Sequence, residues 1–474
     1  MTITTPHAQL AGELDTFGPV LPRLAVLGTG YLGAVHAASM AELGMDVVGV
    51  DTDAERLQAL AAGKSPFYEP QFDEMLARHT HSGRLSFESD LANALSGADV
   101  AFVCVGTPQL RGSNSADLRY VESAVRDVAR HTERDILIVG KSTVPVGTAA
   151  RLRAAVTEVL AQRGRGDLRV EVVWNPEFLR EGKAVQDTLT PDRIILGGAS
   201  AWAEHTMRVV YGQAIAAGIP FISCDLETAE LVKVAANAFL ATKISFINAI
   251  GQLCENSGAD VGVLADALGH DVRIGRQFLN AGLGFGGGCL PKDIRALMHR
   301  ADELGANWAV SLLHQVDEIN MWQRQHVIDL AVAVCGGSVL NRRIGVLGAA
   351  FKPLTDDVRD SPALNVAAAL HLRGAQVSVY DPCAAEPAQR QFPALDYATS
   401  TEDAVEGADV VMVLTEWSDF VHADPDRLAA LTRHRTVVDA RNCLDVQAWR
   451  AAGWTVHTLG RDGASHAAQY VDLR

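Results

Sequence analysis

The sequence predicts an α/β protein in which two doubly wound parallel sheets are joined by a long central helix and further helices. Short apolar strands alternate with helical patterns in two separate stretches of the chain, and a glycine-rich turn follows the first strand. Between the two stretches lies one long Ala-rich helical pattern. Strands that are apolar along their whole length are typical of parallel sheets covered by helices on both faces.

The first stretch begins with a strand, a turn, a helix and a second strand. Residues 24–27 are apolar, residues 28–33 read Gly-Thr-Gly-Tyr-Leu-Gly, and an Ala-rich helical pattern runs through Leu43. Gly44 separates this helix from a strand at 47–50, and more strands are expected at 100–105, 136–139 and 170–173. This alternation predicts a dinucleotide-binding type of sheet over residues 21–212.

A helical domain is expected next, over residues 213–335. The pattern from Leu226 to Ser257 has Asp225 at its N-cap and Gly258 as its stop. At 1.5 Å per residue this helix is roughly 48 Å long, enough to span two domains. Strands at 344–347, 377–381, 410–414 and 436–439 then predict a second sheet in residues 336–474. Residues 1–20 lack periodicity and are expected to form a flexible tail.

Composition excludes several classes of protein. The chain has 474 residues and a formal charge of −16, so nucleic acid is not expected as a partner. No apolar run approaches the roughly 18 residues of a membrane span, and no secretion signal is evident. A soluble, cytoplasmic protein without a membrane partner is expected. The seven cysteines are an odd number without metal-ligand spacing, so neither a disulfide scaffold nor a metal site is expected.

The glycine turn after the first strand predicts a nucleotide site. Gly28 permits a tight turn, Gly30 lets the backbone approach a pyrophosphate, and Gly33 allows close packing of helix on sheet. Asp51, at the end of the next strand, would accept a hydrogen bond from a ribose 2′-hydroxyl and repel a 2′-phosphate, which favours NAD over NADP. Arg56 is either a cofactor contact or a solvated helix residue. A glycine turn without a ligand is the alternative.

A second glycine cluster, at 282–288, leads directly into Cys289. Pro291 indicates that a helix starts here, so Cys289 lies at a helix N-terminus, where the dipole favours thiolate over thiol. Oxidation of an aldehyde needs such a nucleophile, because the covalent adduct can give up a second hydride. The alternatives are a packing role for Cys289 and an ordinary first-turn role for Asp293.

Two other segments carry candidate polar groups. Lys233 and Asn237 are four residues apart on the long helix and project from one Ala-rich face, although a helix lysine in water is an open alternative. Residues 175–182 resemble a helix start with Asn175 as cap. Glu177 and Glu181 would then share a face, for acid/base work or simply to suit the helix dipole.

These segments together resemble the UDP-glucose/GDP-mannose dehydrogenase family, with matching motifs from about residue 22 to about 460. The motifs are GTGYLG (28–33), VGTP (105–108), KSTVPVGT (141–148), NPEFLREG (175–182), PDRIILGG (191–198), ELVKVAANAFLATKISFIN (230–248), GFGGGCLPKD (284–293), FKPLTDDVRDSP (351–362), YDP (380–382) and DARN (439–442). The resemblance implies two Rossmann-like domains, the first for NAD and the second for the nucleotide of a sugar. It also implies a homodimer or a higher homo-oligomer built on the long helix.

The reaction implied by the resemblance is a four-electron oxidation of UDP-glucose to UDP-glucuronate at C6, with two NAD per sugar. Cys289 is implied to attack the C6 aldehyde, giving a hemithioacetal and then a thioester that Glu177 helps to hydrolyse. The other catalytic residues implied are Lys233 and Asn237, which stabilise oxygen charge at C6, and Asp293 and Thr143, which position water or manage protons.

The resemblance also implies two sets of binding residues. The set for NAD is Gly28, Gly30, Tyr31, Leu32, Gly33, Asp51, Arg56, Thr107, Thr143, Glu181 and Arg359. The set for the UDP-sugar is Phe178, Leu179, Arg180, Lys233, Asn237, Asn280, Phe285, Gly286, Phe351, Lys352 and Arg441, with Arg273 from a neighbouring subunit.

Two residues depart from the family pattern. Gly288 stands where Ser is usual, beside the nucleophile, and Val146 stands where Pro is common. Gly288 is expected to affect rate more than reaction type. Three alternative functions stay open: a GDP-mannose 6-dehydrogenase, an inactive binding protein that retains the fold, and a two-electron hydroxyacid dehydrogenase.

Overall fold

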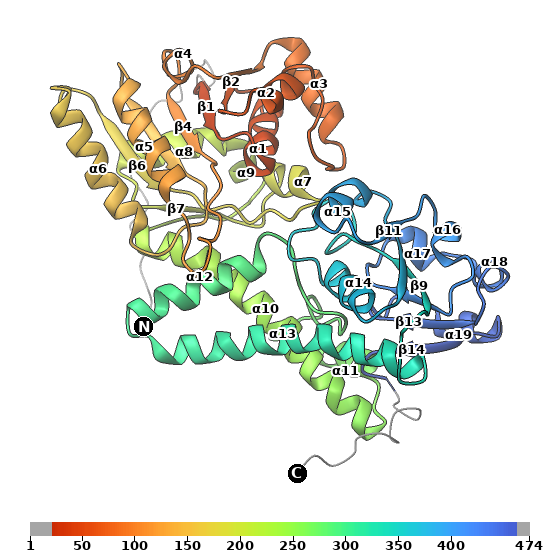
Figure 1. Cartoon of the computed structure of the whole chain (residues 1–474). Helices are drawn as coiled ribbons and strands as arrows, with labels where there is room; N and C mark the ends of the chain where they lie inside the picture. The colour runs from red at the N-terminus through yellow and green to blue at the C-terminus, as the bar shows by residue number, and fades with distance from the viewer. Residues whose placement is uncertain (1–20, 462–474) are drawn as a thin grey trace.

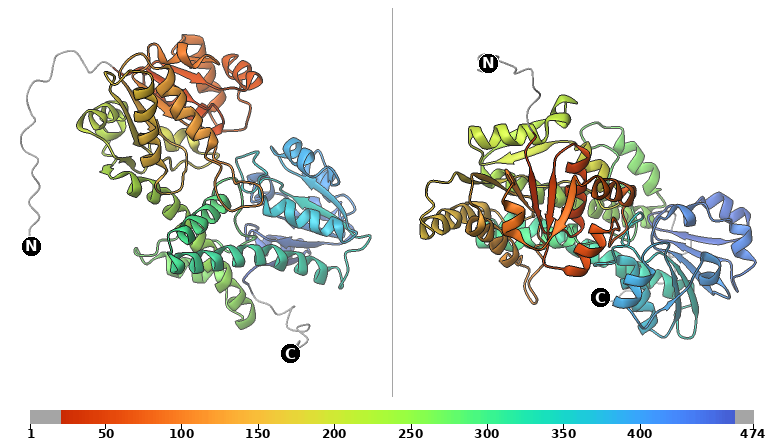
Figure 2. Two further views of the ribbon diagram at one scale, coloured as in Figure 1. Left: turned by 60° about the vertical axis from the view of Figure 1, so that its left-hand side comes forward. Right: turned by 90° about the horizontal axis from the view of Figure 1, so that it is seen from above.

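The computed structural model describes residues 21–461, so the predicted tail at 1–20 lies outside the described residues. Figure 1 shows two sheet units joined by long helices. In Figures 1 and 2 the two units are separate bodies, with the long helices between and below them. This arrangement confirms the predicted fold class.

The first unit contains an eight-stranded sheet in the order β3-β2-β1-β4-β5-β6-β7-β8. All neighbouring strands are parallel except β6 and β7, which pair antiparallel through Trp174 and Gly197. The strands are β1 (Leu24–Leu27), β2 (Val47–Val50), β3 (Leu85–Glu88), β4 (Val100–Val103), β5 (Ile136–Gly140), β6 (Val170–Trp174), β7 (Ile194–Gly197) and β8 (Phe221–Cys224).

Helices cover both faces of this sheet, because successive side chains of a strand point to opposite faces. Leu24 and Val26 of β1 pack with α1, α3 and α7, whereas Ala25 and Leu27 pack with α5 and α6. The helices of this unit are α1 (Tyr31–Glu42), α2 (Ala54–Ala61), α3 (Phe72–Ser82), α4 (Leu91–Leu95), α5 (Arg119–His131), α6 (Thr148–Gln162), α7 (Ala184–Leu189), α8 (Ala201–Val210) and α9 (Gly212–Ala216).

The central region is helical, as predicted, and consists of α10 (Leu226–Ser257), α11 (Val261–Gly269), α12 (Leu290–Glu303) and α13 (Asn307–Val334). The Asp225 side chain accepts from Thr228 N, and Gly258 is left-handed at φ 76°. Both predicted ends of α10 are therefore confirmed. By length and composition, α10 is the one helix among the described residues that would suffice to cross a membrane, and 44% of its apolar window is buried inside the protein.

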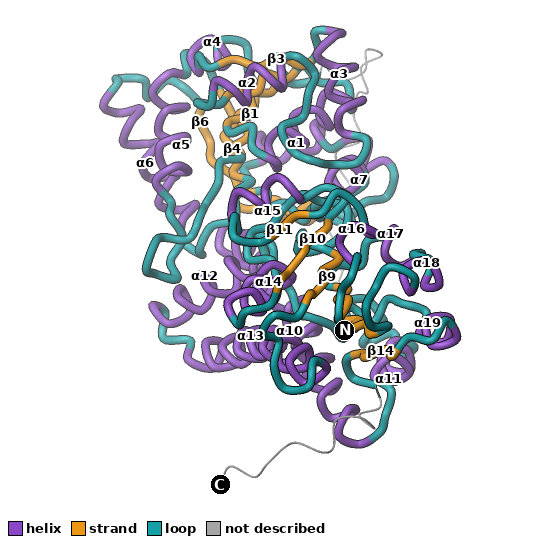
Figure 3. Tube along the Cα trace, turned by 45° about the vertical axis from the view of Figure 1, so that its right-hand side comes forward, coloured by secondary structure: helices purple, strands orange, loops and turns teal. Residues whose placement is uncertain are grey.

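The second unit is a six-stranded, all-parallel sheet in the order β11-β10-β9-β12-β13-β14. Figure 3 shows its strands enclosed by helices and loops. The strands are β9 (Arg343–Leu347), β10 (Gln376–Tyr380), β11 (Asp396–Tyr397), β12 (Val410–Val413), β13 (Thr436–Asp439) and β14 (Thr455–Thr458). The helices are α14 (Pro362–Leu372), α15 (Ala385–Gln391), α16 (Thr401–Val405), α17 (Ser418–Val421), α18 (Pro425–Ala429) and α19 (Val446–Ala451).

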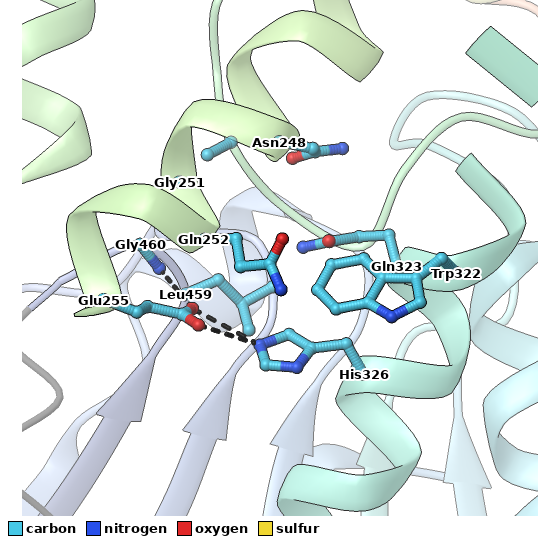
Figure 4. A pocket seen from close by; sticks show the side chains of 10 residues that line it. Asn248, Gly251, Gln252, Glu255, Trp322, Gln323, His326, Leu459 and Gly460 are labelled. Atoms are coloured by element: carbon cyan, nitrogen blue, oxygen red, sulfur yellow. Dashed lines mark hydrogen bonds and ion pairs between the residues drawn. The ribbon is translucent and has the colours of Figure 1, made fainter. Parts of the chain in front are cut away.

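Polar contacts join the second unit to the long helices. Glu255 of α10 accepts a hydrogen bond from Gly460 N at 2.8 Å and lies 3.1 Å from His326 of α13 (Figure 4). Nearby, the Asn248 side chain accepts from Gly282 N at 2.8 Å. Asn248 thus ties the loop 281–289 to α10, and Asn442, after β13, donates to Ala281 O at 3.1 Å and ties the same loop to the second unit.

Candidate functional site

The glycine turn after β1 has the shape of a nucleotide cradle. Gly28 is left-handed at φ 86°, and a Cβ on Gly33 would lie 1.8 Å from the Gly28 carbonyl oxygen. A Cβ on Gly30 would meet no atom within 4 Å, and no side chain caps the N-terminus of α1. Open space beside free helix N–H groups fits a pyrophosphate. The neighbouring Tyr31 and Leu32 begin α1 and are half-buried.

Asp51 lies beside this turn, at the carboxyl end of β2. It accepts hydrogen bonds from Thr29 N at 2.7 Å and from Arg56 Nη1 at 3.0 Å. Burial opposes its ionisation, but the backbone N–H groups of Asp53 and Thr29 and the charge of Arg56 lower its pKa overall. The carboxylate therefore stays charged and can accept from a ribose hydroxyl. Arg56 is held by Asp51 rather than lying free in solvent.

The second glycine cluster is packed against side chains of α13 and of the loop after β9. Gly284 and Gly287 are left-handed, and a Cβ on Gly287 would meet the Phe351 ring at 2.7 Å. Asn320 holds the backbone of Phe285 with its side-chain amide: Oδ1 accepts from Phe285 N at 2.8 Å, and Nδ2 donates to Phe285 O at 3.0 Å. Arg324 Nη2 donates to Phe285 O at 3.1 Å. At Gly284 and Gly287 a side chain larger than hydrogen has no room.

Cys289 is the N-cap residue of α12, and its carbonyl oxygen accepts from Asp293 N at 2.9 Å, as the predicted helix start requires. Cys289 is exposed to solvent on one side and has protein groups around it on the others. Burial, followed by the Glu177 carboxylate, raises the pKa of the thiol to about 12, although Lys233 acts to lower it. This raised pKa favours the thiol in the free protein over the expected thiolate, and its first cause is burial rather than charge.

Lys233 and Asn237 lie on the same face of α10, as their spacing predicts. Lys233 Nζ is 2.9 Å from Glu177 Oε1; Lys233 is buried, and the Glu177 side chain is 12% exposed. Burial alone would lower the pKa of Lys233, but Glu177, Cys289 and Asp293 raise it overall. Asn237 Nδ2 donates to Asp293 Oδ2 at 2.7 Å. Two polar pairs therefore lie beside the sulfur, one acid–base pair and one amide–carboxylate pair.

Thr107 and Thr143 are also brought together. Thr107 Oγ1 donates to Thr143 O at 2.8 Å, and Lys292 Nζ lies 3.3 Å from Thr107 Oγ1. The same ammonium lies 3.0 Å from Asp293 Oδ1. The motifs after β4 and β5 are thus connected to the cysteine-bearing helix through Lys292.

The segment 175–182 is not a helix start, which corrects the sequence expectation. Residues 175–180 lie outside any helix or strand, and α7 begins at Ala184. Asn175 does not act as a cap because its side chain accepts from Tyr211 and Lys141 and donates to Ile195 O. Glu177 and Glu181 therefore point to different partners instead of sharing a helix face.

Glu69 holds the far end of this segment, and no sequence pattern had indicated it. Its carboxylate accepts from Gly182 N and Ala184 N, each at 2.7 Å. The Tyr31 hydroxyl also donates to Glu69, so the nucleotide turn is connected to the segment 175–182. Burial and this carboxylate raise the pKa of Tyr31.

Glu181 meets the second unit. Its carboxylate accepts from Arg359 Nη2 at 3.1 Å, and its carbonyl oxygen accepts from Lys352 Nζ at 2.7 Å. Burial and the Asp357 charge raise the pKa of Glu181 to about 7. A Cβ on Gly288 would lie 2.4 Å from the Arg359 guanidinium carbon. The unusual glycine at 288 therefore leaves room for Arg359.

Some of the remaining predicted residues lie at the glycine cluster or near Arg193, and the others are bound to local partners. Arg441 donates to Gly284 O at 3.0 Å and to Phe351 O at 3.2 Å, so it joins the glycine cluster to the second sheet. Phe178 packs under the Arg193 guanidinium, 3.8 Å from the ring centroid, next to half-buried Leu179. The residues that lie apart from the sulfur, bound to local partners, are Arg180 (to Asp187), Asn280 (to Arg276) and Arg273 (to Asp271).

Three comparisons with known proteins bear on this site. The model of the UDP-glucose/GDP-mannose dehydrogenase family matches as an NAD binding domain at residues 22–215, a central domain at 227–322 and a UDP binding domain at 345–446. The chain is 39% identical to UDP-glucose 6-dehydrogenase YwqF of Bacillus subtilis, over 92% of this chain and 97% of that protein.

Two other similar proteins agree with this match. The chain is 40% identical to UDP-glucose 6-dehydrogenase of Rhizobium meliloti, over 93% of this chain and 99% of that protein. Among solved structures, a UDP-glucose dehydrogenase from the archaeon Pyrobaculum islandicum superposes with a TM-score of 0.84 at 38% identity. That alignment covers 94% of this chain and 100% of the other.

Proposed function

The chain belongs to the UDP-glucose/GDP-mannose dehydrogenase family, and we propose that it oxidises UDP-glucose to UDP-glucuronate at C6 with two NAD per sugar. The enzyme is an NAD-dependent nucleotide-sugar dehydrogenase. The observation that carries the finer proposal is the grouping around residue 289. A thiol at a helix N-terminus lies within the electrostatic reach of a buried Lys233–Glu177 pair and of Asp293.

NAD, when bound, accepts a hydride from the sugar C6 in each of the two oxidations. The residues that would hold it are those of the turn 28–33, with Asp51 for a ribose hydroxyl. Residues 345–446 match the UDP binding domain of the family, and the corresponding acid of the second sheet, Asp381, does not repeat the arrangement at Asp51. Its carboxylate already accepts from Ala349 N, Ala350 N and Trp417 Nε1, which leaves it little capacity for a ribose. We therefore assign the UDP-sugar to residues 336–474 and NAD to residues 21–212.

The protein's own groups account for the steps between the two oxidations. The Cys289 sulfur adds to the C6 aldehyde: a carbon–sulfur bond forms, the C6 carbonyl π bond breaks, and the thiol proton passes to the C6 oxygen, which gives a neutral hemithioacetal. The hemithioacetal then loses a hydride and its hydroxyl proton to become a thioester. Lys233 and Asn237 supply donors for the C6 oxygen.

Hydrolysis of the thioester completes the reaction. Glu177 takes a proton from water as the water attacks, the carboxylate product leaves, and the thiol is restored. Asp293 and Thr143 lie near enough to the same groups, through Asn237 and Lys292, to orient that water. The overall change removes four electrons from C6.

Substrate choice and stoichiometry can be measured together. Purified enzyme with limiting UDP-glucose and excess NAD is expected to give two NADH per sugar. Turnover with GDP-mannose and none with UDP-glucose would reverse the substrate assignment, and one NADH per sugar would replace the four-electron reaction by a two-electron one. Cys289→Ser is expected to lose net turnover while NAD binding and fold are kept.

We also propose that the enzyme is a homodimer in the cytoplasm and that α10 forms the core of the dimer. Four large apolar side chains of α10 are exposed along one stripe, namely Leu231, Phe239, Phe246 and Leu253. Apolar patches of this kind on a soluble protein mark association sites. The Arg273 side chain is 85% exposed. In such a dimer, Arg273 of one subunit would reach the sugar site of the other.

A further inference from the structure

A buried lysine that the reaction steps do not use lies behind the segment that carries Glu177. Lys141 follows β5 directly and is 6% exposed. Its ammonium donates to Asn175 Oδ1 at 3.0 Å and to the Tyr211 hydroxyl at 3.2 Å, and lies 3.5 Å from Asn175 O. All of these partners are neutral, and no ion pair joins Lys141 to a carboxylate in residues 21–461.

A structural role alone does not explain the charge. Asn175 Oδ1 accepts from the Tyr211 hydroxyl at 2.7 Å as well as from Lys141, and a neutral donor would satisfy its second lone pair without a buried charge. An ammonium buried without an acid partner costs desolvation energy, which a Met of similar length would avoid. The charge also has a local cost, because burial and Lys141 together lower the pKa of His36 well below its usual range. The buried charge therefore calls for a role other than packing.

The geometry connects this ammonium to Glu177. Asn175 is fixed on every side: its N–H donates to Gly140 O at 2.8 Å, and its side chain donates to Ile195 O at 2.7 Å. The chain leaves the sheet at this residue and reaches Glu177 two positions later. The charges of Lys141 and Glu177 both act on the Cys104 thiol, one lowering and the other raising its pKa, so both lie near β4's end.

We propose that Lys141 is a positioning residue for Glu177. Its buried ammonium, bonded to Asn175, fixes the place where the segment that carries Glu177 leaves the sheet. A charged donor holds an amide oxygen about twice as strongly as a neutral one. The placement matters most for hydrolysis of the thioester, since that step needs Glu177 in contact with a water molecule. This inference rests on the proposed function and adds a residue to it.

The test separates the steps of the reaction. With Lys141→Met, a rapid first release of NADH is expected to persist, whereas net turnover falls about 10- to 100-fold, the scale of a misplaced catalytic group. Intact-protein mass spectrometry of acid-quenched reactions is expected to show the sugar adduct accumulating on Cys289. The thermal unfolding midpoint is expected not to fall, because a buried unpaired charge is removed.

Three further variants keep the outcomes distinct. Glu177→Gln is the positive control for adduct accumulation, and its failure to accumulate adduct would overturn the proposed function itself. Lys141→Gln keeps a donor without the charge and is expected to behave like Lys141→Met. Tyr211→Phe removes the neutral donor to Asn175 and one acceptor of Lys141, but it keeps the bond from the ammonium to Asn175, so turnover at nearly the normal rate is expected.

The role of Lys141 is disproved separately from the reaction. If Glu177→Gln accumulates adduct while Lys141→Met slows every step equally or loses stability instead, the lysine is structural. Adduct accumulation in Tyr211→Phe equal to that in Lys141→Met would show that the hydrogen-bond network, and not the ammonium, places Glu177.

Discussion

The pKa of the Cys289 thiol depends on a few neighbouring groups that act in opposite directions. Its place at the N-terminus of α12 favours the anion, whereas burial and the Glu177 carboxylate favour the thiol and raise the pKa to about 12. Lys233 acts in the opposite sense. At neutral pH the thiol form dominates. As the pH rises toward the pKa, the thiolate fraction grows about tenfold for each pH unit.

This balance predicts how fast Cys289 reacts with iodoacetamide in the free enzyme. The labelling rate is expected to rise about tenfold per unit from pH 7 to pH 10 without a plateau. Glu177→Gln is expected to speed labelling at pH 8, since it removes a charge that raises the pKa, and Lys233→Met is expected to slow it. Peptide mass spectrometry of residue 289 measures the rate. A plateau near pH 7 would contradict the pKa direction.

Asp51 predicts the cofactor preference in a similar way. Asp51→Ser removes a charged acceptor for the ribose. It also frees Arg56, which lies 3.0 Å from Asp51 in the native protein, to bind a 2′-phosphate. The KM for NAD is expected to rise roughly 10- to 100-fold, while the KM for NADP falls. Initial rates with each cofactor measure the change. An unchanged ratio would remove Asp51 from cofactor recognition.

Sequence reasoning identified the residues with chemical groups but not the residues that place them. Asp51, Cys289 and Lys233 lie on recognisable motifs, and their local positions are as expected. Glu69 is an ordinary loop acid in the sequence, and its contact with Gly182 depends on how two distant segments meet. The pKa of Cys289 likewise depends on carboxylates supplied by another element, which spacing along α12 does not reveal.

Elements with strong local signals were predicted well. Asp225 and Gly258 bound α10 because caps act within a few residues of the helix end. The segment 175–180 carries a cap residue and a proline as well, yet it is not helical. Asn175 is bonded to β7 and to Lys141, and these tertiary contacts outweigh the local preference. Short edge strands such as β11, with two residues, gave no detectable pattern.

The two ends of α3 predict opposite effects on stability. Gln71, at the N-cap, is left-handed at φ 66°, which costs a residue with a side chain about 1–2 kcal/mol. Gln71→Gly is therefore expected to raise the thermal unfolding midpoint, despite the added chain entropy of glycine. Gly83, at the C-cap with φ 75° and open space around it, is the matched control, and Gly83→Ala is expected to lower the midpoint. A decrease with Gln71→Gly would contradict this account.

At the scale of the whole molecule, the candidate site exists only where three bodies meet. The segment after β6 supplies Glu177 and Glu181, the central helices supply Lys233 and Cys289, and the loop after β9 supplies Arg359. Contacts such as Lys352 to Glu181 O, at 2.7 Å, fasten the second unit across the site. The sequence predicts the two sheets and the helices between them, but it does not predict this closure, because no local pattern encodes a contact between distant units.

The apolar stripe on α10 makes the last prediction, which concerns the assembly. Phe239 is 66% exposed and Leu253 is 62% exposed, and a free helix face of this kind costs solvation energy that a second copy would remove. Phe239→Glu with Leu253→Glu places charges in the proposed interface, so sedimentation velocity is expected to show a monomer where the native enzyme is a dimer. Leu372→Glu, at the 84% exposed end of α14, is the matched control and is expected to stay dimeric. If the double variant sediments like the native enzyme, the dimer is built on another face; if the native enzyme is itself a monomer, the stripe has another partner.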